Sequence, residues 1–331
     1  MSLTKKVSFM DSIKAKLSSA KSDDTKSAKK HKKQKKEKKH KPQQVITYTP
    51  VIPPIPAPVS GPVPTSVPTK RALLIGINYL SDSRNRLNGC INDVKSVKEL
   101  LTGKFSYDPS NVVLMSDDQT GPMLPTKENI LSQLNKAVSL TKPGDTLFIH
   151  YSGHGIQVTS LNDDEKTNED TPNQDDCICP CDFNNYAGNG GFILDDLLKE
   201  IVVNKIPAGA KLRAFFDCCH SGSVLDLEYI WKKDGDFAVS SAPELQSDDI
   251  LLISGCRDSQ TSADTYNAQK QQAMGALTMM LLKALANIGE IQTTWRDLLL
   301  LTRHYLADGG YPQFPMISVA NKNTIYNVID L

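Results

Sequence analysis

Thr146-Leu-Phe-Ile-His-Tyr-Ser-Gly-His-Gly155 is an apolar run of strand length that stops abruptly at small and polar residues. About 65 residues later, Lys211-Leu-Arg-Ala-Phe-Phe-Asp-Cys-Cys-His-Ser-Gly-Ser223 follows the same pattern. The first run delivers a histidine to the end of a strand, and the second delivers a cysteine. If the two strands are parallel neighbours, an imidazole lies beside a thiol. That pairing produces a thiolate nucleophile at neutral pH.

Strand-like and helix-like segments alternate along the rest of the chain. Apolar runs predict strands at 72–77, 112–115, 146–151, 212–216 and 250–254, and amphipathic patterns predict helices at 89–102, 126–140, 195–203, 276–286 and 294–307. This alternation indicates an α/β fold with a mostly parallel sheet covered on both faces. In such sheets function gathers at the carboxyl ends of the strands, where His154 and Cys219 both fall.

Composition divides the chain into three parts. Residues 1–41 hold 15 lysines against 4 acidic residues and are predicted to be a disordered, Lys-rich leader. Residues 42–69 are rich in proline and are predicted to be a semi-rigid linker. Residues 70–331 are then a single folded domain with an acidic balance.

The same composition bears on location and partners. No stretch approaches the ~18 apolar residues that a membrane span needs, and residues 1–20 lack a signal-peptide core. We expect a monomeric cytoplasmic protein with reduced cysteines, and the lysine run leaves a nuclear location as an alternative. Because that run has no interleaved aromatic residues, a nucleic-acid partner is not expected.

The candidate nucleophile is Cys219, and the alternative is a buried structural cysteine. The candidate acid–base group is His154, and the alternative is a surface loop histidine. Small residues around both favour the catalytic reading, since they allow close approach of a substrate. His220 adjoins the nucleophile but is poorly aimed at it, and His150 is expected to pack inside its strand.

Together these two motifs resemble those of the metacaspases, cysteine peptidases of the caspase-like clan. Further similar segments are Gly76–Tyr79, Leu87–Val94, Cys179–Phe183, Ile253–Cys256 and Gln260–Asp264, and the proline-rich leader resembles type I members. The resemblance implies a caspase-like three-layer sandwich, with a mostly parallel twisted sheet between helices. A large-subunit-like region would span about 70–265 and a small-subunit-like region about 271–331. It also implies a calcium-stimulated endopeptidase that cleaves after Arg or Lys.

The resemblance assigns the acidic floor of the S1 pocket to Asp93 and Asp217, with Cys90 and Ser152 beside them. Two carboxylates select a basic side chain through charge-assisted hydrogen bonds. They would repel an acidic side chain, so specificity for Asp is disfavoured. The alternatives are a helix first-turn acid for Asp93 and a cap of the turn after the strand for Asp217.

The resemblance also implies a calcium site, whose ligands match Asp175, Asp195, Asp196 and Asp226. Calcium prefers six to eight oxygen ligands, so water and carbonyl groups would complete the shell. Binding is expected to order the polar loop at 160–182 and the S1 region. The alternative role of Asp195 is an ordinary helix N-cap. Asp176 could replace the adjacent Asp175 as a ligand.

The alternating cysteines Cys177, Cys179 and Cys181 match zinc spacing poorly, and we expect them to pack. The same expectation holds for Cys218.

In the expected mechanism Cys219 attacks the scissile carbonyl and His154 handles the protons. The backbone N–H groups of Gly155 and Cys219 would hold the oxyanion. No third member of a triad is evident, so we expect a dyad.

Self-processing and regulation are further expectations. Candidate self-cleavage sites are Lys41, Lys70 and Lys270, and the leader is a candidate autoinhibitor. The rival function is a catalytically silent scaffold of the same fold, with a basic tail for nucleic acid or anionic partners. Both the cysteine and the histidine are present, which disfavours that reading.

Overall fold

The computed structural model describes residues 67–159, 174–219, 224–231, 236–239, 245–255, 264–267, 272–288 and 292–331. All of them belong to one compact unit, Gly61–Leu331. The Lys-rich leader, His220, and the proposed cleavage sites Lys41 and Lys270 lie outside the described residues.

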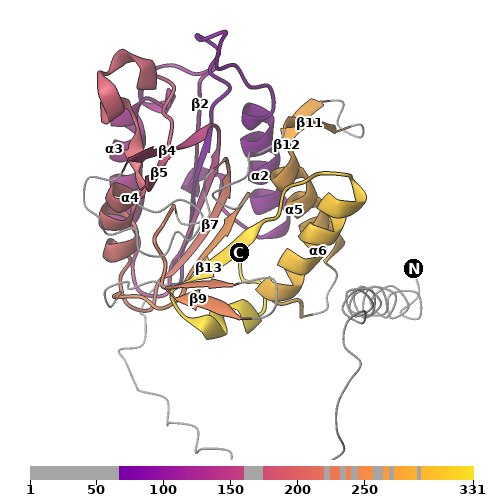
Figure 1. Ribbon diagram of the computed structural model, residues 1–331. Coiled ribbons are helices and arrows are strands. Elements are labelled where there is room, and N and C mark those ends of the chain that lie inside the picture. The colour runs from indigo at the N-terminus through magenta and orange to yellow at the C-terminus, as the bar shows by residue number, and fades with distance from the viewer. Residues whose placement is uncertain are drawn as a thin grey trace, which may run out of the picture. The chain divides into compact units, whose positions relative to one another are not determined.

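The centre of this unit is an eight-stranded sheet with the order β2-β1-β3-β7-β10-β13-β8-β9 (Figure 1). The first five strands are parallel: β2 (Val112–Ser116), β1 (Lys70–Gly76), β3 (Thr146–Ser152), β7 (Lys211–Asp217) and β10 (Ile250–Ser254). The last three continue the sheet in antiparallel fashion: β13 (Met316–Val319), β8 (Tyr229–Trp231) and β9 (Phe237–Val239). The predicted α/β class with a mostly parallel sheet is confirmed.

Helices cover both faces of the sheet and make three layers (Figure 1). α3 (Lys127–Ser139) and α4 (Asp195–Ile201) pack on one face, and α2 (Cys90–Lys104), α5 (Ala276–Asn287) and α6 (Trp295–Asp308) pack on the other. Successive side chains of a strand point to opposite faces, so Leu73 and Ile75 join the first core while Ala72 and Leu74 join the second. None of the described helices is both long and apolar enough to cross a membrane.

Two small sheets and several short turns complete the described fold. One sheet has the order β4 (Gly155–Thr159), β5 (Gln174–Ile178), β6 (Ile193–Leu194), and the other pairs β11 (Asp264–Asn267) with β12 (Gln272–Gly275). Short 3₁₀-helices lie at Pro109–Asn111, Gly121–Met123, Phe183–Asn185, Gly188–Gly191, Val203–Lys205 and Lys322–Tyr326. The prediction of one polar loop over 160–182 was wrong at its C-terminal part, because β5 pairs there with both β4 and β6.

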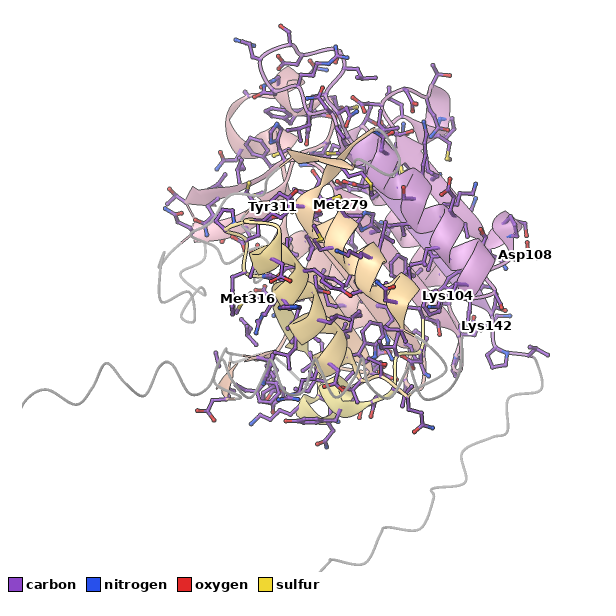
Figure 2. The ribbon with its side chains drawn as sticks, turned by 90° about the vertical axis from the view of Figure 1, so that its right-hand side faces the viewer. Lys104, Asp108, Lys142, Met279, Tyr311 and Met316 are labelled. Atoms are coloured by element: carbon purple, nitrogen blue, oxygen red, sulfur yellow. The ribbon has the colours of Figure 1, made fainter. Side chains whose placement is uncertain are left out.

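Helix α5 is anchored at both ends by side chains from other elements. Its N-cap, Gly275, has no side chain to accept a hydrogen bond from the first turn. Asp217, at the end of β7, replaces it: its Oδ2 accepts from the backbone N–H and the hydroxyl of Thr278, each at 2.8 Å. At the other end Lys104 of α2 donates its Nζ to the carbonyl of Ile288 at 2.9 Å (Figure 2).

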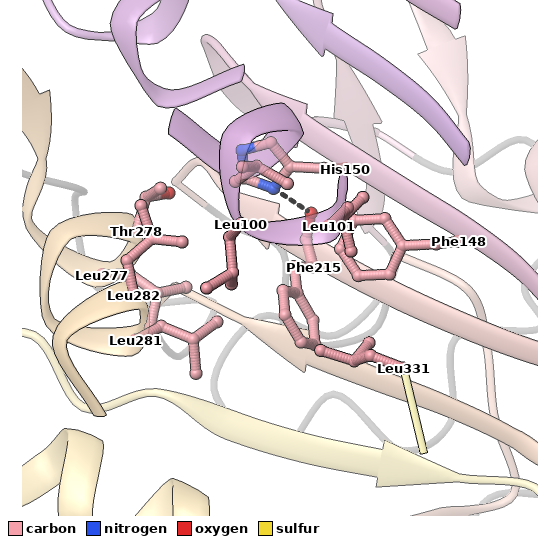
Figure 3. A pocket seen from close by; sticks show the side chains of 11 residues that line it. Leu100, Leu101, Phe148, His150, Phe215, Leu277, Thr278, Leu281, Leu282 and Leu331 are labelled. Carbon is pink, nitrogen blue, oxygen red and sulfur yellow. Dashed lines mark hydrogen bonds between the residues drawn. The ribbon is translucent and has the colours of Figure 1, made fainter. Parts of the chain in front are cut away.

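His150 lies behind this helix, in a small apolar cavity between α2, α5 and the sheet (Figure 3). As predicted, it packs inside β3 and is fully buried, and its Nδ1 donates to the carbonyl of Phe215 at 3.0 Å. Its Nε2 is buried and has no hydrogen-bond partner among the described residues. Burial lowers the pKa of His150 from 6.5 to about 4, because a charged imidazole would lose its solvation there.

The buried imidazole predicts a loss of stability in mild acid. Between pH 6.5 and about pH 4 the unfolded chain binds a proton at His150 that the folded chain does not bind. The free energy of unfolding therefore falls as the pH falls through this window, by roughly 3 kcal/mol from this group. In His150→Gln this contribution is absent, so denaturant titrations should show a shallower pH dependence than in the wild type. Asn135→Gln, on the exposed face of α3, removes no titrating group and is the control that should keep the wild-type slope. Equal slopes in wild type and His150→Gln would contradict the assignment.

Candidate active site

The pairing of β3 with β7 brings the two predicted strand tips together. The strands are parallel, and their last paired residues are Ser152 and Asp217. His154 and Cys219 each follow two residues later, so they leave the same edge of the sheet from adjacent strands. Gly155 confirms the proximity, because a Cβ built on it would overlap the carbonyl oxygen of Cys219.

The imidazole of His154 is oriented by a main-chain group. Its Nε2 lies 2.8 Å from the carbonyl oxygen of Asn85. Since a carbonyl can only accept, Nε2 carries the proton and Nδ1 is the basic nitrogen. The sequence predicted a dyad with no third member. The structure adds an orienting carbonyl, which no side-chain pattern could have revealed.

The adjacent cysteines differ in exposure. Cys219 is half-buried, while Cys218 is buried and packs in the core. Of the two, Cys219 is therefore the one that a substrate can reach.

Cys177, Cys179 and Cys181 are present as free thiols. Desolvation raises the pKa of Cys179 and of Cys181 to about 12, so both stay protonated. No group of three or more His, Cys, Asp or Glu side chains is arranged to hold a metal ion in the described part of the chain.

The predicted S1 acids lie together behind the strand tips. Asp93 of α2 accepts a 2.6 Å hydrogen bond from Ser152, and both are buried. The N–H of Gly275 also donates to Asp93, at 3.0 Å. A Cβ on Gly275 would overlap Oδ2 of Asp217, so the two carboxylates converge on this glycine. Cys90, the fourth predicted member, is buried at the first position of α2.

Asp93 and Asp217 also have structural roles at the starts of two helices. Asp93 does lie in the first turn of α2, where it favours the helix dipole in addition to its place in the site. Asp217 caps α5 through Thr278. Sequence reasoning missed Gly275 and Thr278, because they come from a distant segment with no local signal.

Asn78 was also missed as a functional residue. Its Oδ1 accepts from the backbone N–H groups of Cys90 and Ile91, at 2.9 and 3.3 Å, and so caps α2. The sequence feature that could have revealed Asn78 is its place in Gly76–Tyr79, one of the segments that resemble the metacaspases.

Two of the predicted calcium ligands are buried between β5 and α4. Asp175 is only 3% exposed, and its Oδ1 has no hydrogen-bond partner among the described residues. Asp195 is buried at the first position of α4, and its Oδ2 accepts from the backbone N–H of Asp176 at 2.8 Å. The N-cap of this helix is Leu194, so the alternative role of Asp195 was wrong.

The other two predicted ligands are less enclosed. Asp196 lies in the first turn of α4 and is half-buried. Asp226 adopts a left-handed backbone with φ 44°, and its Oδ2 lies 3.7 Å from the ammonium of Lys199. The oxygen chemistry of these residues suits calcium, and Asp226 is already paired with Lys199 in the structure.

Lys70 lies in a location that disfavours self-cleavage. It is the first residue of β1 and pairs with Thr146 of β3. Its Nζ donates to the carbonyls of Phe105 and Leu331, at 2.9 and 2.6 Å. Cleavage after Lys70 would require this end of the sheet to open.

Comparison with known proteins agrees with this geometry. Residues 70–228 match the family described as metacaspase, peptidase C14 domain. Metacaspase-2 of Trypanosoma brucei brucei is 37% identical over 268 residues, which cover 76% of this chain and 73% of that protein. Metacaspase-1 of Candida glabrata is 33% identical over 300 residues, with coverage of 76% and 73%.

Two further matches are more limited, one in the share of the relative that is covered and the other in sequence identity. Metacaspase-5 of Trypanosoma cruzi is 35% identical over 277 residues, and the chain spans 60% of the length of that relative. A solved structure of a Geobacter sulfurreducens protein matches with a TM-score of 0.55 at 22% identity, covering 79% of this chain and 100% of that one, which supports the fold alone. With the histidine and cysteine segments at one sheet edge, the sequence matches show that this chain belongs to the metacaspase family.

Proposed function

We propose that this protein is a cysteine endopeptidase that cleaves peptide bonds after Arg or Lys. The observation that carries the proposal is the register of β3 against β7, in which Ser152 pairs with Asp217. That register brings His154 and Cys219 to one edge of the sheet, directly beyond two buried acids. Family membership supports the peptidase part, and the buried carboxylates support the choice of a basic residue.

The mechanism follows from the protonation of His154. Nδ1, which is left basic by the bond from Nε2 to Asn85, takes the thiol proton of Cys219. The thiolate attacks the scissile carbonyl carbon, and the N–H groups of Gly155 and Cys219 hold the oxyanion that forms. The C–N bond breaks as the imidazolium gives its proton to the leaving amine. Water then hydrolyses the thioester, releases the acid product and restores the thiol.

Selection of a basic side chain follows from the two buried carboxylates. Asp93 and Asp217 accept hydrogen bonds from Ser152, Gly275 and Thr278, all of which are neutral donors. Neutral donors lower the desolvation cost of a buried carboxylate, but they leave its net charge in place. A guanidinium or ammonium group in the pocket would supply the opposite charge.

The reaction and its specificity are tested first with fluorogenic Arg, Lys and Asp peptides. The Arg and Lys peptides should be cleaved and the Asp peptide should not, because the acids repel it. Cys219→Ala should lower kcat by at least about 10⁴-fold while the thermal midpoint is kept. Cleavage of the Asp peptide, or full activity in Cys219→Ala, would overturn the proposal. A folded wild type that cleaves none of the three would favour the silent-scaffold alternative.

The S1 role of Asp217 is separable from its role as a helix cap. In Asp217→Asn the amide oxygen still accepts from Thr278, but the negative charge is gone. We expect kcat/KM for the Arg peptide to fall by about 10- to 100-fold, corresponding to roughly 1.4–2.7 kcal/mol of lost charge-assisted binding. The thermal midpoint of unfolding should change little in Asp217→Asn. In Asp217→Ala both kcat/KM and the thermal midpoint should fall. Asp308→Asn, at the exposed end of α6, is the matched control. An unchanged preference for Arg in Asp217→Asn would exclude this residue from the pocket.

Calcium is the second part of the proposal. Asp175, Asp195, Asp196 and Asp226 would hold the ion after they move together, since the described residues contain no preformed metal-binding group. In the structure Lys199 supplies a charge to Asp226 instead. Lys199 and calcium therefore compete for one carboxylate.

This competition gives opposite expectations for two variants in calorimetric calcium titrations. Lys199→Met should bind calcium several-fold more tightly than the wild type, and Asp175→Asn should bind it about tenfold or more weakly. Lys205→Met, outside α4, is the control. Calcium binding that is unchanged in both variants would place the ion elsewhere.

Self-processing at Lys270, in the segment between β11 and β12, is tested by measuring the intact mass of the protein after calcium is added. The absence of a mass shift in the wild type would exclude self-processing at this site.

A further inference from the structure

We propose that Tyr79 is a positioning residue, which together with Tyr151 holds the backbone and the ring of His154 in the orientation needed to accept the proton of Cys219. The proposal rests on the assignment of His154 and Cys219 in the proposed function. It does not depend on the substrate class.

The two tyrosine hydroxyls bind both main-chain polar groups of His154. The backbone N–H of His154 donates to the hydroxyl of Tyr79 at 2.8 Å, and the hydroxyl of Tyr151 donates to the carbonyl of His154 at 2.7 Å. Tyr79 uses its own proton on the carbonyl of Cys179, at 2.7 Å. The peptide groups on either side of the imidazole are thus fixed by two rigid side chains from the core.

Tyr79 also restrains the imidazole itself. Its ring centroid lies 4.7 Å from that of His154, with 35° between the ring planes. On the other side, Nε2 of His154 is held by the carbonyl of Asn85. With one face and one nitrogen occupied, rotation of the imidazole is limited and Nδ1 keeps one direction. Misplacement of a catalytic group by as little as about 1 Å can cost about 10²-fold in rate.

The residue before the histidine is small enough to admit this arrangement. A Cβ built on Gly153 would stand 2.6 Å from the hydroxyl of Tyr151 and 3.1 Å from that of Tyr79. Any other residue would push both hydroxyls away from the backbone of His154. The need for glycine at position 153 is therefore a consequence of the two tyrosines.

Tyr79 is held in an unusual backbone conformation. Its φ is 53°, in the left-handed region that is unfavourable for a residue with a side chain. The carboxylate of Asp117 accepts from the N–H of Asn78 at 2.8 Å and from that of Leu80 at 2.7 Å. These bonds hold the backbone on both sides of Tyr79. The same loop continues to Asn85, so one segment supplies both the hydroxyl and the orienting carbonyl.

The tyrosines keep their protons under all conditions in which the enzyme would act. Burial raises the pKa of Tyr79 and of Tyr151 well above the usual value of 10. Each hydroxyl therefore remains a donor, and neither competes with His154 for the thiol proton.

The test is the alkylation of Cys219 by iodoacetamide as a function of pH, read by mass spectrometry of the peptide that contains it. Tyr79→Phe keeps the ring and removes the hydroxyl. We expect the rate at pH 7 to fall roughly tenfold and the midpoint of the pH profile to move upward, since a misaligned imidazole stabilises the thiolate less. Tyr151→Phe should act in the same direction. With the Arg peptide, kcat should fall while KM stays within about twofold.

Tyr107→Phe is the matched control. Tyr107 is equally buried, and its hydroxyl has no hydrogen-bond partner among the described residues. Its alkylation profile should match the wild type. A wild-type profile in folded Tyr79→Phe and Tyr151→Phe, or an equal shift in Tyr107→Phe, would overturn the proposal. If Tyr79→Phe does not fold, the Tyr151→Phe profile alone decides. If His154→Ala alkylates as fast as the wild type, the catalytic pair itself fails, which is a separate result.

Discussion

The parallel pairing of β3 with β7 is the constraint on which the rest of the site depends. In a parallel ladder the carboxyl ends of neighbouring strands emerge at one edge, and the pairing of Ser152 with Asp217 sets the offset between them. A shift by one residue would turn the side chains of one strand to the opposite face, and would separate His154 from Cys219. The apolar runs that bury both strands on both faces therefore also determine the catalytic geometry.

Close approach of the chain to itself is the second constraint, and it explains where glycine is needed. Gly155 faces the carbonyl of Cys219, and Gly275 faces the carboxylate of Asp217. Each glycine brings a backbone segment against a proposed catalytic or pocket residue from another element. The site is consequently assembled from α2, β3, β7 and the start of α5, and no single segment could form it alone.

The sequence predicted the elements that carry strong local patterns and missed those that do not. The five parallel strands were visible because each is an apolar run, and all but the edge strand β2 are buried on both faces. β8, β9 and β13 are three or four residues long, and so short a strand has no readable period. In the site, Cys219 and His154 were found from their strand tips. The carbonyl of Asn85 carries no sequence signal, and the cap that Asp217 gives α5 depends on a contact 61 residues away.

In the proposed function, the acids Asp93 and Asp217 serve both the architecture and the specificity of the site. Asp217 lies at the N-terminus of α5, where the helix dipole and two hydrogen bonds from Thr278 stabilise its negative charge. The fold thus stabilises a carboxylate that is only 4% exposed beside Asp93, which is fully buried. In the division expected from the sequence, helix α5 belongs to the small-subunit-like region, whereas both acids belong to the large-subunit-like region. Under the proposed function, the docking of α5 against Asp217 therefore contributes to the recognition of a basic side chain.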